Sequence, residues 1–106
     1  MVYRPVMTSA IQHTVAFRLQ HPAGSDAERE FLTAALVLAD IPGVQEFRQL
    51  RQVSPKSAFT FSFSMRFDDG DAYQAYNDHP THVAFVRDRW QAEVADFAEL
   101  DFVALD

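Results

Sequence analysis

Two histidines flank a proline in a segment that also carries two tyrosines, and these side chains are the strongest candidates for proton exchange. The segment contains Tyr73, Tyr76, His79, Pro80 and His82. Imidazole has the ordinary pKa closest to neutral pH, so histidine is the commonest general acid or base. The spacing of the two histidines would place both rings on one side of a regular helical turn, but the intervening proline alters that geometry.

Each candidate also has a structural interpretation. His82 is either a buried imidazole, hydrogen-bonded so that it holds the corner at Pro80, or a group that transfers protons or contacts a ligand. Tyr76 is either a core aromatic with a satisfied hydroxyl or part of the same site. His79 is expected to be a corner residue. His13, further towards the N-terminus, lies on the inward face of a predicted strand, where a satisfied core histidine is usual.

A metal site has less support. Asp78, His79 and His82 offer ordinary ligand types, but the proline between the histidines removes regular helical spacing, and we predict no metal. The acidic turn 68–71 resembles part of a calcium loop without its closing glutamate, so turn and helix-cap chemistry explain it better. The absence of cysteine excludes disulfides, thiolate zinc sites and cysteine nucleophiles.

Composition narrows the function classes further. The chain has 106 residues, 48% of them hydrophobic and ten of them Phe, which is enough to build a core. Its formal net charge is −6 and its nine basic residues are scattered, so we expect no nucleic-acid partner. No segment approaches the roughly 20 apolar residues that span a bilayer, so we expect no membrane partner and a cytoplasmic location.

Hydrophobic periodicity predicts the elements that position these residues. Alternation predicts strands over 11–20 and 58–67, the second with a wall of Phe and Met on one face. Turn signals bound a less regular strand predicted at 44–53, with a bulge that shifts its alternation, and a last strand is predicted over 97–105. Helical spacing predicts helices over 26–39, after a capping box at Ser25, and over 81–95, with a short helix at 72–76 before Pro80.

The resulting order is β-α-β-β-α-β, which predicts an α+β, ferredoxin-like fold with a four-stranded antiparallel sheet and helices on one face. The other face needs cover, so we expect two sheets to pack face to face as a dimeric α/β barrel, with the chain itself as partner. Residues 1–10 are predicted to be a flexible N-terminal extension and residues 11–106 a single domain.

The sequence resembles the stress-responsive A/B barrel family, often called Dabb. The resemblance rests on the strand 11–18, on the segment Tyr76-x-x-His79-Pro80-x-His82-x-x-Phe85 and on the pair at 96–97, and it extends from about residue 11 to residue 102. It implies a dimeric ferredoxin-like barrel. Most members have no assigned activity, so the fold transfers more safely than any function.

One member, a plant cyclase, closes a linear polyketide thioester by aldol condensation with a Tyr and a His of this segment. The resemblance implies that His82 is a general base, that Tyr76 stabilises the developing oxyanion or orients His82, and that His13 faces the pocket. It implies no cofactor. Aromatic walls line apolar pockets as well as cores, so we also predict Phe61, Phe63 and Phe85 as ligand contacts.

Three functions remain open at this point. The first is a small-molecule-binding dimer that acts as a cofactor-free cyclase or lyase on a polyketide-like or aromatic carbonyl compound. The second is a non-catalytic, stress-related assembly protein with a filled interior. The third is a cofactor-independent monooxygenase, which shares the fold but which the Dabb-like segment argues against.

Overall fold

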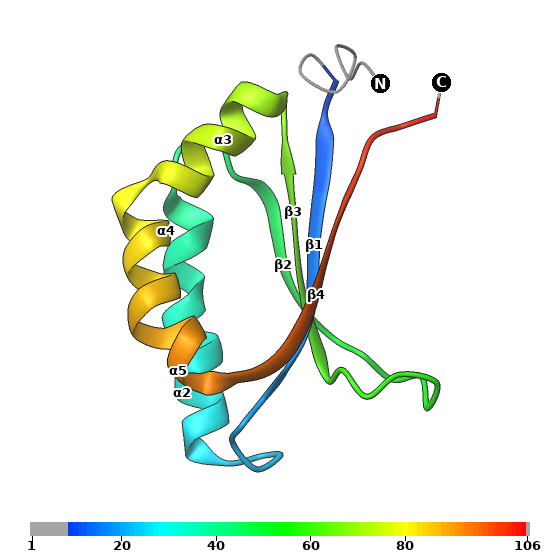
Figure 1. The fold of residues 1–106 in the computed structure, drawn as a ribbon, viewed down its shortest axis with the longest axis vertical. Coiled ribbons are helices and arrows are strands. Elements are labelled where there is room, and N and C mark those ends of the chain that lie inside the picture. The colour runs from blue at the N-terminus through cyan, green and yellow to red at the C-terminus, as the bar shows by residue number, and fades with distance from the viewer. Residues whose placement is uncertain (1–8, 106) are drawn as a thin grey trace.

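The computed structural model describes residues 9–105, and its elements follow the predicted β-α-β-β-α-β order (Figure 1). The expected extension 1–10 falls almost wholly outside the described residues. The elements are β1 (Ile11–Leu19), α2 (Asp26–Ala34) with a 3₁₀ continuation (Ala35–Asp40), β2 (Gln45–Arg51), β3 (Phe61–Phe67), α3 (Gly70–Asp78), α4 (Pro80–Phe85), a π-helical turn (Val86–Trp90), α5 (Gln91–Glu93) and β4 (Val94–Phe102).

The four strands form one antiparallel sheet in the order β2-β3-β1-β4, which confirms the ferredoxin-like fold. The central strand β1 pairs with β3 on one side and β4 on the other, so His13 lies opposite both Met65 and Asp101. Figure 1 shows all the helices on one face of this sheet and none on the other. The segment that carries the candidate residues therefore packs over the inner face.

The core forms because β1 and β3 each alternate buried and less buried residues along their whole length. The alternate residues meet the buried face of α2 and its continuation. Phe17 is completely buried, and its ring lies within 6 Å of four aromatic rings, those of Phe31, Phe61, Phe63 and Trp90. Aromatic packing of this kind contributes beyond the area it buries.

Local signals fix the helix starts as predicted. The Ser25 hydroxyl accepts a hydrogen bond from the Glu28 amide, at 3.2 Å. The Glu28 carboxylate accepts from the Gly24 amide rather than from the cap residue, because the Ser25 amide already donates to Pro22. The acidic turn 68–71 works as expected too, since the carboxylate of Asp69 caps α3.

The expected irregularity of β2 is confirmed. Its register against β3 shifts between Gln45 and Arg48, and Glu46 between them has a positive φ of 52°. A residue other than glycine in this left-handed conformation marks a bulge, where one strand carries an extra residue.

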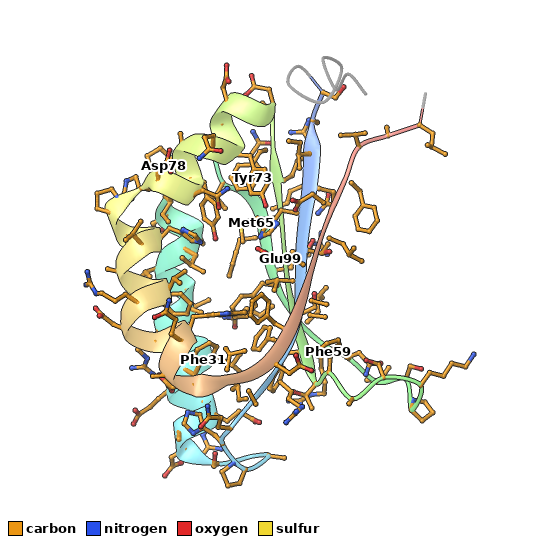
Figure 2. The ribbon with its side chains drawn as sticks, viewed as in Figure 1. Phe31, Phe59, Met65, Tyr73, Asp78 and Glu99 are labelled. Atoms are coloured by element: carbon orange, nitrogen blue, oxygen red, sulfur yellow. The ribbon has the colours of Figure 1, made fainter. Side chains whose placement is uncertain are left out.

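Predicted boundaries were wrong in three elements. The strand expected at 58–67 begins at Phe61, and Figure 2 shows Phe59 away from the helices, beside the connection from β2. The last helical region, expected to end near Ala95, ends at Glu93. The last strand, expected over 97–105, is β4 at Val94–Phe102, and its first residue pairs with Leu19. Pairing with β1 therefore overrides the helical spacing of the sequence.

The outer face of the sheet lacks cover from any element among residues 9–105. Leu50, Leu100 and Phe102 are 46–59% exposed, although the register places them beside the outward-facing residues of the central strands. No helix formed by the described residues is long and apolar enough to cross a bilayer.

We expect Phe17→Ala to lower the free energy of unfolding by about 3–5 kcal/mol, because it removes a ring from the centre of the aromatic core and leaves a cavity. Urea denaturation followed by circular dichroism measures the change. Val53→Ala, at a residue that is 86% exposed, is the control and should change stability by less than about 0.5 kcal/mol. A loss below about 1 kcal/mol for Phe17→Ala would contradict this description of the core.

Candidate active site

A cavity of about 440 Å³ lies between the inner face of the sheet and the helices. It brings together five of the six residues predicted from the sequence, which are His13, Phe63, Tyr76, His82 and Phe85. The sixth, Phe61, is buried but lies outside the lining, under the guanidinium of Arg51, which is 5.2 Å from its ring centre. The segment 73–85 and β1 therefore meet in one hollow.

The break between α3 and α4 positions His82. Helix α3 ends at Asp78, His79 caps α4 by accepting a hydrogen bond from the Thr81 amide, and Pro80 occupies the first turn, where a missing amide hydrogen costs nothing. The end of α3 leaves backbone carbonyls without helical partners. The Nδ1 atom of His82 lies 3.0 Å from one of them, the carbonyl oxygen of Asn77.

This contact fixes the tautomer of neutral His82. A carbonyl oxygen only accepts hydrogen bonds, so the ring hydrogen must sit on Nδ1. Nε2 then carries the lone pair of a ring that lines the cavity. His82 thus holds the corner, as the structural interpretation expected, and offers a proton acceptor to the cavity at the same time.

The surroundings of His82 favour its neutral form. Burial lowers the pKa of His82 below its ordinary value of 6.5, because the charged ring loses solvation, and nearby His13 acts in the same direction. The hydrogen bond to Asn77 and the charge of Glu99 oppose this shift without cancelling it. At neutral pH His82 is therefore an unprotonated base.

Tyr76 lies directly beside this base. Its ring is 4.4 Å from the His82 ring, and the residue is almost completely buried. Burial raises the pKa of the Tyr76 hydroxyl above its ordinary value, and the charge of Glu99 adds to the shift. The hydroxyl stays protonated and has no hydrogen-bond partner within residues 9–105, so its hydrogen is available to a ligand.

His13 is held on the opposite wall by a polar cluster. Its Nδ1 lies 2.6 Å from the carboxylate of Asp101, whose second oxygen accepts from the Tyr73 hydroxyl at 2.9 Å. Its Nε2 is 3.8 Å from a carboxylate oxygen of Glu99, beyond hydrogen-bond distance. His13 is thus buried, with its Nδ1 hydrogen-bonded to Asp101, while its ring also lines the cavity.

Sequence reasoning placed Tyr73 in the candidate segment without assigning it a role, and it missed Glu99 and Asp101. Figure 2 shows Tyr73 and Glu99 in the layer between helices and sheet, whereas Asp78 lies on the outer side of the helices. The sequence signal that could have found the two carboxylates is the alternation of the last strand, since residues 97, 99 and 101 must share a face. Which face depends on the register with β1, and this register becomes visible only when the strands are paired.

The helical wall of the cavity contains the π-helical turn. Val86 and Trp90, which bound this turn, both line the hollow. Such wide turns are rare and occur often at functional sites. Among the described residues, no group of three or more histidine, cysteine, aspartate or glutamate side chains is arranged to hold a metal ion.

The shifted pKa of His82 has a measurable consequence for stability. The unfolded chain takes up this proton near pH 6.5, whereas the folded chain takes it up only at lower pH, so the contribution of His82 is complete above pH 6.5 and falls as the pH drops below it. We expect the stability advantage of the wild type over His82→Gln to shrink between pH 7 and pH 5. Denaturation series measure this, and an advantage that grows towards pH 5 would contradict the assigned shift.

Comparison with known proteins assigns the family. The family model of the stress responsive A/B barrel domain, Dabb, matches residues 11–104. A Dabb family protein with a ferredoxin-like fold from Mesorhizobium loti is 54% identical, with a TM-score of 0.92 over 92% of this chain and 99% of that chain. No curated protein matches the chain significantly.

More distant solved structures share the fold. A hydroxynitrile lyase from Passiflora edulis has a TM-score of 0.78 at 13% identity, over 93% of this chain and 96% of that chain. A dimeric ferredoxin-like protein of unknown function from Thermobifida fusca has a TM-score of 0.75 at 24% identity, over 91% and 92%. The family model and the Mesorhizobium protein together show that this chain belongs to the Dabb family of stress-responsive A/B barrel domain proteins.

Proposed function

We propose that this protein is a homodimer that binds a small, largely apolar carbonyl compound in each subunit and acts on it as a cofactor-free lyase or cyclase. The observation that carries the proposal is the single cavity that Tyr76, His82 and His13 line together. Its volume of about 440 Å³ lies within the range of small-molecule sites, roughly 300–1,000 Å³. Its walls are mostly apolar and aromatic, as in such sites.

The chemistry follows from the two neighbouring groups. The Nε2 lone pair of His82 removes a proton from the carbon next to a carbonyl, and the electron pair of the broken C–H bond forms a new C–C bond to a second carbonyl carbon. The oxygen of that second carbonyl takes the negative charge, and the Tyr76 hydroxyl donates a hydrogen bond to it. The proton on His82 then returns to this oxygen, so the site ends in its starting state.

The fold is compatible with lyase chemistry. The Passiflora protein with the same fold is a hydroxynitrile lyase, but its 13% identity supports the architecture alone. The assignment of His82 as base and Tyr76 as donor therefore rests on their positions in this chain.

The bare outer face of the sheet favours the homodimer. The two edge strands expose apolar side chains on this face, with Leu50 on β2 and Leu100 and Phe102 on β4, and a second copy offers a matching surface that would cover them. Solved structures of the same fold from Bacteroides fragilis and Thermobifida fusca are described as dimeric. We propose that residues of β4 and β2 on this face, with Leu100 among them, form the contact.

We expect Leu100→Asp to convert the dimer into a monomer, because it places a charge in the proposed interface. Leu36→Asp is the matched control, since Leu36 is exposed to a similar degree but lies on the helical side. Light scattering after gel filtration gives the mass of each. The proposed contact would be refuted if the wild type were a monomer, or if Leu36→Asp disrupted the dimer and Leu100→Asp did not.

We expect the protein to catalyse exchange of the methyl hydrogens of acetophenone for deuterium in D₂O, followed by proton NMR, because this reaction needs only a base and an oxyanion donor. His82→Gln should slow the catalysed exchange by about a hundredfold or more, and Tyr76→Phe by about tenfold or more. His79→Asn keeps a helix-capping side chain at the corner and should leave the rate within about twofold. Equal exchange rates for the wild type and His82→Gln would rule out His82 as the base.

A further inference from the structure

Among the described residues that line the cavity, one carries a carboxylate, Glu99. The remaining lining residues are apolar, aromatic or neutral amides, apart from the two histidines, and none of them is lysine or arginine. A buried anion usually needs a cationic or multiple hydrogen-bonding partner. The cavity wall offers no such cation to an anionic ligand.

Glu99 lies where the cavity meets solvent. Its side chain is 55% exposed, yet the residue also lines the hollow, opposite Val15 of the central strand. One of its carboxylate oxygens lies 3.8 Å from Nε2 of His13, and within residues 9–105 its carboxylate accepts no side-chain hydrogen bond. Glu99 therefore has free acceptor capacity, unlike Asp101, whose two oxygens are used by His13 and Tyr73.

A second carboxylate strengthens this effect. Asp101 stands two residues further along the same face of β4, outside the lining of the cavity, so its negative charge adds to that of Glu99 from a longer range. Like charges repel more strongly beside a low-dielectric wall than in water, and solvent at the exposed Glu99 weakens the effect without removing it. The entrance is thus unfavourable for a carboxylate or a phosphate group.

We propose that Glu99 is a specificity-determining residue, which selects an uncharged aromatic compound with a hydroxyl group and rejects its anionic analogues. The hydroxyl donates to the free Glu99 carboxylate, while the ring lies against the apolar walls formed by Phe63, Phe85 and Trp90. This inference rests on the proposed small-molecule function and names the ligand class of that same site.

Three probes of one shape and different charge test the proposal: benzyl alcohol, benzoate and benzylamine in its cationic form. Titrations of ¹⁵N-labelled full-length protein, followed through the amide shifts of the cavity-lining residues, give a dissociation constant for each. We expect the wild type to bind benzyl alcohol at least about tenfold more tightly than benzoate. Glu99→Gln should narrow this ratio to within about threefold, mainly by a gain in benzoate affinity.

Glu30→Gln is the control, because Glu30 is an exposed carboxylate of α2 outside this cavity, and it should leave the ratio unchanged. Benzoate binding as tightly as benzyl alcohol to the wild type, or an unchanged ratio in Glu99→Gln, would overturn the role of Glu99 while leaving the binding function intact. If benzylamine bound most tightly of the three probes, the proposal that the site selects an uncharged ligand would be wrong. If none of the three probes changed the amide shifts of the cavity-lining residues, both the small-molecule function and this inference would be wrong.

Discussion

The central strand β1 is the constraint on which the rest of the structure depends. It pairs with a neighbour on both sides, so a shift of one residue would turn its whole apolar set away from the helices. Every second residue from Ile11 to Leu19 is buried, and His13 is the only polar member of that series. The same register that builds the core therefore sets one imidazole into the wall of the cavity and brings Asp101 to its side.

The second histidine is positioned by a different device, the interrupted helix. A continuous helix through 70–93 would satisfy the carbonyl of Asn77 internally, and His82 would have no fixed partner there. Because His79 and Pro80 end one helix and start another, that carbonyl is free and accepts the Nδ1 hydrogen of His82. One broken helix thus fixes a tautomer, while burial keeps the ring neutral.

Local patterns were sufficient to predict what depends on local physics. Alternation predicted β1 and most of β3, and local polar residues predicted the cap at Ser25 and helix-cap chemistry in the acidic turn 68–71. The segment that contains Tyr76 and His82 was recognisable because its residue types are rare together and because it resembles a known family. The bulge in β2 was visible as a loss of alternation between turn signals.

Long-range pairing accounts for what was missed. Val94 continues the helical spacing of Val86 and Trp90, and only its partner Leu19 makes it the first residue of a strand. The role of Glu99 in the cavity likewise depends on its register against Val15, which no local pattern encodes. Phe61 was expected at the ligand because it shares a face with Phe63, but it lies outside the lining of the cavity, paired with Phe17 and beneath the guanidinium of Arg51.

The proposed chemistry depends on the backbone of Asn77, which holds neutral His82 with its hydrogen on Nδ1 and its lone pair on Nε2, where it can accept a proton in the cavity. Long-range ¹H–¹⁵N correlation spectra of the imidazole distinguish the two tautomers directly, at a pH above 7. We expect the His82 spectrum to show a protonated Nδ1 and an unprotonated Nε2. A spectrum with the hydrogen on Nε2, or with a rapid mixture of both tautomers, would contradict it.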